Sequence, residues 1–241
     1  MDGFGKIPAA LRDSSPLASR RSPGGPPDLG GDRGLGSGLE RRNPGAGPGR
    51  PGRRRPVVVG LGGSARTDSP TMRALGAVIR MVAQAGAETV LLSLTELDLP
   101  PYSPESAERT QAARRLVGEI GRADGLIIAA PDYLGGTSGL IANALDYVWD
   151  LRDAPRPCLD ARPVGLLACE EGPGAGGALT ALRARVHALG GWPTPLGITL
   201  TRHESTSIDA YGAVANPAVA DRFDTLTDQI MGFAYAWSHL I

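Results

Sequence analysis

The sequence lacks long apolar runs and has few cysteines and histidines, and each shortage excludes a class of protein. No run approaches the roughly 18 apolar residues that a membrane-spanning helix needs. Two cysteines in 241 residues exclude a disulfide scaffold. Cys158 and Cys169 have no metal-ligand spacing with the three histidines, so no metal site is predicted. We expect a soluble, cytoplasmic protein with reduced thiols and no contact with a membrane.

Lysine is almost absent, whereas arginine and glycine are abundant. Lys6 is the only lysine among 25 basic residues, and the chain holds 34 glycines. In such a composition an isolated arginine or glycine says little about a site. Only clustered residues at defined positions carry weight.

Residues 1–55 differ in composition from the rest of the chain. They hold eleven basic against five acidic residues, although the whole chain has no net charge, and 13 of the 34 glycines. Such a segment buries too little apolar surface to fold, so we interpret it as a disordered basic arm rich in Gly, Pro and Arg. A dispensable tail is the favoured role. Two other roles remain open for the arm, which are targeting and nucleic-acid contact through its arginines. Nucleic-acid contact is not expected in the rest of the chain.

Residues 56–241 are expected to form one domain in which apolar runs alternate with helical patterns. Continuous apolar runs are typical of strands buried on both faces of a parallel sheet. Strict alternation predicts an α/β fold, a doubly wound sheet of five parallel strands, with ligands beyond the carboxyl ends of the strands. The expected strands are 57–61, 89–94, 125–130, 163–168 and 196–200, and the expected helices are 70–85, 106–122, 138–151, 175–189 and 216–239.

The loop after the first strand has two interpretations. Gly60-Leu61-Gly62-Gly63-Ser64-Ala65 fits the dinucleotide pattern G-x-G-x-x-(G/A). Serine is favoured at a helix N-cap and proline at the first helical position, so Ser69 and Pro70 start the helix too late for that pattern. Residues 63–69 then form a loop with three hydroxyls and Arg66 at a helix N-terminus, which suits a terminal phosphate. An ordinary polar turn is the alternative.

The loop after the third strand suits a flat ligand. Gly135 and Gly136 permit close approach of the backbone, and Tyr133 can offer its ring or hydroxyl. Thr137 or Ser138 can cap the next helix. That helix carries a broad apolar stripe, part of which could meet a second subunit, although core packing is preferred for the last two of its residues: Leu140, Ile141, Ala144, Leu145 and Val148.

Two motifs at these strand ends together resemble the NADPH-dependent FMN reductase family of flavodoxin-like proteins. They are Gly63-Ser64-x-Arg66-x-x-Ser69 and, about 68 residues later, Pro131-x-Tyr133-x-Gly135-x-x-x-Gly139-x-x-x-Asn143-Ala144-x-Asp146. The similarity covers residues 57–237. It implies the flavodoxin-like strand order 2-1-3-4-5, FMN as cofactor, NADPH or NADH as co-substrate, and a homodimer or homotetramer.

The resemblance also implies which residues bind FMN. The phosphate would be held at the first loop by Ser64, Arg66, Ser69, Pro70 and Thr71. The isoalloxazine would be lined by Pro131, Asp132, Tyr133, Leu134, Gly135, Gly136, Thr137 and Ser138, and by Gly172 and Gly174 after the fourth strand. Three positions depart from the family pattern: Leu134 replaces a common Asn, Ala142 a common Lys and Tyr147 a frequent Trp. We expect these changes to affect substrate and subunit contacts more than cofactor identity.

The remaining polar residues near these loops receive structural interpretations. Glu170 and Glu171 are interpreted as a solvated loop face, and Cys169 as a small buried hydrophobe, with a redox role as the alternative. His203 is interpreted as solvated, with substrate or NADPH-phosphate binding as the alternative. No catalytic acid or base is predicted, because a flavin itself carries hydride and electron chemistry.

The resemblance implies an FMN-dependent NAD(P)H oxidoreductase. Hydride would pass in a ping-pong reaction from NAD(P)H through bound FMN to a flavin, a quinone or another small-molecule electron acceptor. Three alternatives stay open: an FMN-dependent dehydrogenase or tailoring enzyme of a biosynthetic pathway, a flavodoxin-like electron carrier, and a flavin-free binding protein. The carrier is disfavoured because the domain lacks a strongly acidic docking surface.

Overall fold

The computed structural model describes residues 54–66, 69–171 and 176–237. Within them a five-stranded parallel sheet has the order β2-β1-β3-β4-β5. Its strands are β1 (Val57–Gly62), β2 (Glu88–Ser93), β3 (Gly125–Asp132), β4 (Pro163–Glu170) and β5 (Trp192–Leu200). The helices are α1 (Pro70–Gln84), α2 (Leu94–Leu97), α3 (Gln111–Arg122), α4 (Gly139–Tyr147), the 3-10 helix η1 (Val148–Leu151), α5 (Ala178–Ala188), α6 (Arg202–Ser205) and α7 (Pro217–Trp237). The predicted fold class and strand order are confirmed.

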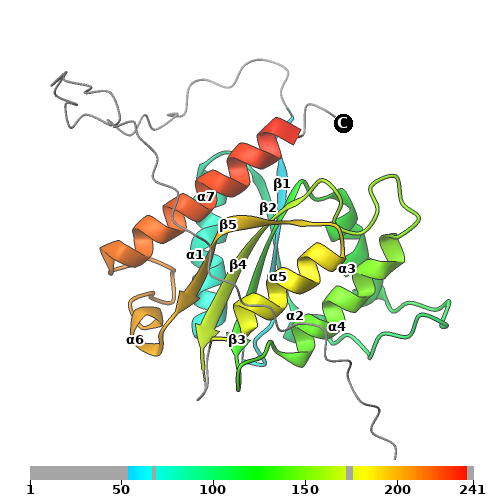
Figure 1. Ribbon diagram of the computed structural model, residues 1–241, viewed down its shortest axis with the longest axis horizontal. Helices are drawn as coiled ribbons and strands as arrows, with labels where there is room; N and C mark the ends of the chain where they lie inside the picture. Colours follow the sequence, from blue (N-terminus) through cyan, green and yellow to red (C-terminus); the bar gives the residue numbers. More distant parts are fainter. Residues whose placement is uncertain (1–53, 67–68, 172–175, 238–241) are drawn as a thin grey trace, which may run out of the picture. The chain divides into compact units, whose positions relative to one another are not determined.

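The sheet lies between two layers of helices (Figure 1). Helices α1 and α7 cover one face, and α3, α4 and α5 cover the other. Successive residues of β1 enter opposite cores: Val58 packs with α1, whereas Val57 and Val59 pack with α3. All residues of β1 and β3 are buried, which explains their continuous apolar sequences.

Several element boundaries differ from the expected ones. Helix α3 begins at Gln111 rather than at 106, because the Thr110 side chain caps it by accepting a hydrogen bond from Ala113 N. Strand β5 begins four residues before its predicted start. Pro193 and Pro195 hid this part of the strand, since proline cannot donate to the ladder and is tolerated only at a sheet edge, where β5 lies. The short helices α2 and α6 were not expected.

Ion pairs and hydrogen bonds from arginine side chains stabilise the amino edge of the sheet. The Asp124 carboxylate accepts hydrogen bonds from Val57 N at 2.8 Å and from both terminal nitrogens of Arg54 at 2.9 and 2.8 Å. Arg55 donates to Gly86 O at 2.9 Å, so the end of the arginine run contacts the domain. Arg162, which precedes β4, is fully buried. The loops that follow the strands lie at the opposite edge of the sheet, where the carboxyl ends of the strands meet.

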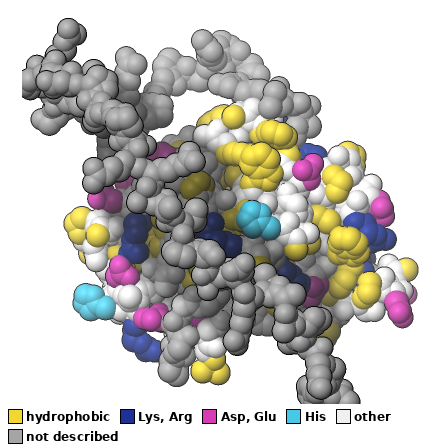
Figure 2. Space-filling view, in the orientation of Figure 1, with side chains coloured by type: hydrophobic (Ala, Val, Ile, Leu, Met, Phe, Trp, Pro, Cys, Tyr) yellow, Lys and Arg dark blue, Asp and Glu magenta, His cyan; other side chains and the backbone are white. Residues whose placement is uncertain are grey.

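Aromatic rings join the start of β5 to the end of α7. The Trp192 ring lies 4.7 Å from Phe233 and 5.9 Å from Trp237, centroid to centroid. Hydrophobic side chains gather near this end of α7 in Figure 2. No helix in the described ranges is long and apolar enough to cross a membrane.

Candidate functional site

The first loop leads from β1 to the N-terminus of α1. Gly63 N continues the sheet by donating to Ala129 O at 3.0 Å. The Ser69 side chain caps α1 by accepting from Met72 N at 3.1 Å, and Pro70 is the first helical residue. The helix start predicted from Ser69 and Pro70 is therefore confirmed. Residues 63–69 separate Gly60 and Gly62 from the helix, whereas in a dinucleotide fingerprint the helix follows the glycines directly.

The polar side chains of this loop differ in their burial. Ser64 is almost fully buried, and its hydroxyl accepts from Arg66 N at 3.2 Å. Ser69 and Thr71 are fully buried, whereas Arg66 is exposed. The sequence-predicted phosphate residues thus share one loop and one helix turn. Thr67 lies outside the described residues.

The second loop begins with a tight turn at the end of β3. Tyr133 and Gly136 exchange backbone hydrogen bonds of 3.1 and 2.9 Å around Leu134 (φ 51°) and Gly135 (φ 79°). Two positive φ angles define a type I′ turn, which favours Asn-Gly. The departure at Leu134 therefore has a physical consequence, because leucine is strained in this conformation. Its side chain is 82% exposed at the tip of the turn.

The first and second loops contact each other directly. The Ser138 hydroxyl donates to Gly63 O at 2.6 Å and accepts from Ile141 N at 3.4 Å, which caps α4. A Cβ atom on Gly63 would lie 2.0 Å from Ile141 Cγ1. Ser138 thus ties the loops together, and only glycine at position 63 allows this approach.

Asp132 links the second loop to the start of α5. Its side chain is fully buried, and Oδ2 accepts from Gly176 N at 2.6 Å and from Ala178 N at 3.3 Å. A Cβ atom on Gly177 would lie 1.8 Å from Gly135 O, so the loops after β3 and β4 touch. The predicted Gly172 and Gly174 lie outside the described residues.

Glu171, just after β4, joins the same group. Its carboxylate accepts from the Thr71 hydroxyl at 2.9 Å and from the Tyr133 hydroxyl at 3.3 Å. Burial and, next, the charge of Glu171 raise the pKa of Tyr133. The interpretation as a solvated loop face missed these contacts, and position after the fourth strand was the only signal in the sequence.

The residues after β5 have mainly structural roles. Glu204 pairs with Arg222 at 2.5 Å and forms a capping box with Thr201, whereas His203 is exposed. Cys169 is fully buried, and burial raises the pKa of its thiol to about 12. The thiol is therefore protonated at neutral pH, in agreement with the small-hydrophobe interpretation.

The second half of the second motif, which contains Asn143 and Asp146, positions segments next to the site. The Asn143 side chain accepts from Tyr102 N at 2.8 Å and donates to Pro100 O at 2.9 Å, and the Tyr147 hydroxyl also donates to Pro100 O, at 3.0 Å. Asp146 pairs with Arg185 of α5. These residues hold neighbouring segments against α4. Leu145 and Val148 are buried in the core, as predicted.

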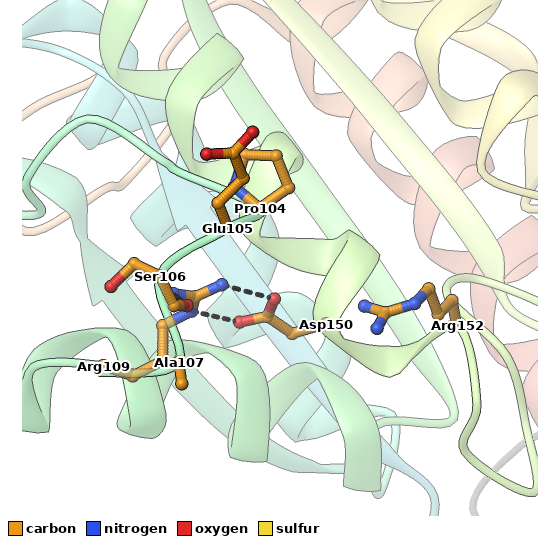
Figure 3. A pocket seen from close by; sticks show the side chains of 7 residues that line it. All are labelled: Pro104, Glu105, Ser106, Ala107, Arg109, Asp150 and Arg152. Carbon is orange, nitrogen blue, oxygen red and sulfur yellow. Dashed lines mark hydrogen bonds and ion pairs between the residues drawn. The ribbon is translucent and has the colours of Figure 1, made fainter.

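A pocket of about 310 Å³ lies elsewhere, between the segment before α3 and η1 (Figure 3). The Arg109 guanidinium faces the Asp150 carboxylate there and donates to both of its oxygens, at 2.6 and 2.9 Å. These charges satisfy each other, and no residue from the loops after β1, β3 or β4 lines the pocket. The described part of the chain contains no cluster of three or more metal-ligating side chains.

Comparison with known proteins identifies the family. The family model described as NADPH-dependent FMN reductase matches residues 56–204. The chain belongs to the NADPH-dependent FMN reductase family. As a member of this family, the protein is an oxidoreductase that uses FMN, with NAD(P)H as co-substrate.

Solved structures of oxidoreductases share the fold. FerB, a flavoenzyme NAD(P)H:(acceptor) oxidoreductase from Paracoccus denitrificans, is 20% identical with a TM-score of 0.64, over 75% of this chain and 98% of FerB. The NADH:FMN oxidoreductase EMOB is 20% identical with a TM-score of 0.58, over 75% and 89% of the chains. An oxidoreductase from Corynebacterium diphtheriae is 16% identical with a TM-score of 0.56, over 76% and 98%.

The residues of this FMN reductase family member fit an FMN molecule at the carboxyl edge of the sheet. Asp132 Oδ1, at the end of β3, and Thr137 Oγ1, in the second loop, are buried and have no hydrogen-bond partner among the residues that the structure describes. Buried polar atoms are almost always paired, so unpaired ones in a loop of this kind point to a missing ligand group. The edge of an isoalloxazine offers an N–H donor and carbonyl acceptors, which suit a carboxylate oxygen and a hydroxyl.

Proposed function

We propose that the protein binds FMN across the loops after β1, β3 and β4 and passes hydride from NAD(P)H to a small-molecule acceptor in a ping-pong reaction. The single observation that carries this proposal is a pair of buried oxygens, Asp132 Oδ1 and Thr137 Oγ1, that have no partner in the described part of the chain. They lie at the end of β3 and in the loop after it, which contacts both of the other loops. FMN supplies the hydride and electron chemistry when bound. The chain supplies binding and orientation.

The first loop is proposed to hold the phosphate. The N-terminus of α1 presents a positive dipole end, which favours an anion. The exposed Arg66 can add a charge-assisted hydrogen bond, and the hydroxyls around it add short donors. The full set proposed for the phosphate is Ser64, Arg66, Ser69, Pro70 and Thr71.

The loops after β3 and β4 are proposed to line the ring. The contact between Gly177 and Gly135 leaves no side chain between these loops, so a flat group can lie against backbone. The proposed ring contacts run from Pro131 to Ser138 and include Gly172 and Gly174. Tyr133, 39% exposed, and Leu134 put apolar surface beside the ring. This surface favours a flat aromatic acceptor such as a flavin or a quinone.

An absorbance spectrum of the purified protein, followed by anaerobic addition of NADPH, tests the proposal. Yellow protein that bleaches on addition of NADPH would support the reductase half-reaction. Yellow protein that NADPH leaves unchanged would favour a carrier or a specialised dehydrogenase. Colourless protein that takes up no added FMN would refute the FMN site and its residues.

A pair of arginine variants tests the phosphate position. Arg66→Ala should weaken FMN binding about 10-fold or more, because a hydrogen bond to a charged group is worth about 1.5–3 kcal/mol. Arg115→Ala, which removes an exposed charge from α3, is the control and should leave the affinity unchanged. Equal FMN affinity in the Arg66 variant and the wild type would remove Arg66 from the site.

We also propose that the protein works in the cytoplasm as a homodimer or homotetramer. Trp149, which follows α4, is 49% exposed and offers apolar surface for a second copy. Light scattering after gel filtration would give the mass in solution, and a monomer would refute the oligomer. Cell fractionation tests the location.

A further inference from the structure

The backbone fixes the position of Glu171 at the carboxyl edge of the sheet. Its N–H donates to Asp132 O at 3.4 Å, extending the pairing of β4 with β3 by one residue. Its carbonyl accepts from the Arg202 guanidinium at 3.5 Å. The side chain therefore leaves the sheet between the first and second loops, where it is half-buried.

The Glu171 carboxylate uses the Thr71 hydroxyl, which belongs to the residues proposed to hold the phosphate. Thr71 is fully buried and donates to Oε1 at 2.9 Å, while Tyr133 donates to Oε2 at 3.3 Å. A hydroxyl has only one proton to donate. Thr71 cannot donate to a phosphate while it donates to Glu171.

The charge of Glu171 has the same sign as a phosphate. The first turn of α1 contains no acidic residue, so this carboxylate, which follows β4, is the anion bonded at the helix start in the described structure. An anion is favoured there by the helix dipole, and a second anion close to it is repelled. The carboxylate and the flavin phosphate would therefore compete for one region.

We propose that Glu171 determines the specificity of the flavin site by competing with the cofactor phosphate. The FMN phosphate must displace or tolerate this carboxylate. Riboflavin has no phosphate and therefore does not compete with the carboxylate. The carboxylate thus lowers the affinity for FMN relative to riboflavin. This inference rests on the proposed function, because it needs flavin in the same loops.

Flavin titrations of matched variants test the inference. Glu171→Gln removes the charge but keeps an acceptor for Thr71, and Glu171→Ala removes both. Glu170→Gln is the control, because it removes one charge from the neighbouring residue, whose carboxylate accepts from Arg202 N at 3.4 Å. The dissociation constants for FMN and for riboflavin would be measured by quenching of flavin fluorescence.

Both Glu171 variants should bind FMN about 10-fold more tightly than the wild type, as expected for removal of a nearby charge at a partly screened site. Riboflavin affinity should stay within about twofold in all proteins, and the Glu170 variant should resemble the wild type for both flavins.

Four results would overturn the inference. The first two are FMN affinity that is unchanged or lower in the Glu171 variants, and a riboflavin affinity that rises as much as the FMN affinity. The third is a higher FMN affinity in the Gln variant only, which would indicate that the new amide acts as a donor. The fourth is an equal rise in FMN affinity in the Glu170 variant. Failure of all proteins, wild type included, to bind FMN would instead refute the proposed function. Equal FMN binding by all of them would refute only the role of Glu171.

Discussion

Arg162 offers the clearest test of how the amino edge of the sheet is stabilised. It is the largest fully buried side chain among the described residues, and its guanidinium donates hydrogen bonds to four main-chain carbonyls. Nε donates to Ala123 O at 3.0 Å, Nη2 to Gly121 O at 2.7 Å, and Nη1 to the carbonyls of Cys158 and Asp160, each at 3.1 Å. The guanidinium thus ties the end of α3 to the segment before β4.

The cost of removing Arg162 follows from these bonds. Arg162→Met would leave the buried Cys158 carbonyl without a donor, at about 1–3 kcal/mol, and would leave Ala123 O with the longer bond from Arg156 Nη1 at 3.3 Å. The other two carbonyls are partly buried and can bind water. Burial lowers the pKa of Arg162 to about 10, so the cation is disfavoured in the fold, and its removal offsets part of the loss. We expect a net destabilisation of about 2–4 kcal/mol.

Thermal and urea unfolding measure this loss. For a domain of this size, about 2–4 kcal/mol corresponds to a fall in Tm of about 5–15 °C. Arg152→Met, on the exposed Arg152 that pairs with Asp153 at 3.3 Å, is the control and should change stability by less than about 0.5 kcal/mol. FMN affinity should stay unchanged in both variants. A methionine variant as stable as the wild type would show that apolar packing replaces the carbonyl bonds without loss, and would refute the reasoning.

Three further substitutions test other parts of the structure. Leu134→Gly should raise the free energy of unfolding by about 1 kcal/mol in urea titrations, since it relieves a positive φ at an exposed turn; an unchanged or lower stability would contradict the strain. Gly63→Ala should lower stability by about 1–3 kcal/mol and weaken FMN binding, because its Cβ would meet a buried isoleucine of α4, whereas Gly139→Ala, with open space around its Cβ, should do neither. Asp150→Asn should cost about 1–2 kcal/mol at pH 7, because hydrogen bonds from its arginine partner hold the pKa of this carboxyl below its usual value. The ionised carboxylate stabilises the fold above the unfolded pKa of about 3.9, so the difference in Tm from the wild type should shrink as the pH falls below that value and through the lowered pKa; a difference that stays constant as the pH falls would contradict the assignment.

Local sequence patterns predicted the features that depend on local chemistry. Continuous apolar runs revealed β1, β3 and β4 because strands buried on both faces leave no polar positions. Ser69 and Pro70 revealed the start of α1 because capping acts within one helical turn. The first part of β5 escaped prediction because its prolines resemble those of a loop.

Contacts between distant residues could not be predicted in this way. The role of Glu171 depends on Thr71, 100 residues away, and on Tyr133, 38 residues away. Neither spacing produces a periodic pattern, and a glutamate beside a glycine-rich stretch suggests only a solvated loop. The unpartnered oxygens of Asp132 and Thr137 likewise become informative only when burial is known.

The prolines of β5 also affect how the sheet meets other proteins. An edge strand with free N–H groups can pair with a strand of another molecule and start aggregation. Pro193 and Pro195 have no N–H to offer, and Leu196 N is bonded to the Gln229 side chain of α7 at 3.0 Å. A foreign strand would find few donors along this stretch. The same residues that hid the strand in the sequence therefore protect its edge from pairing with a foreign strand.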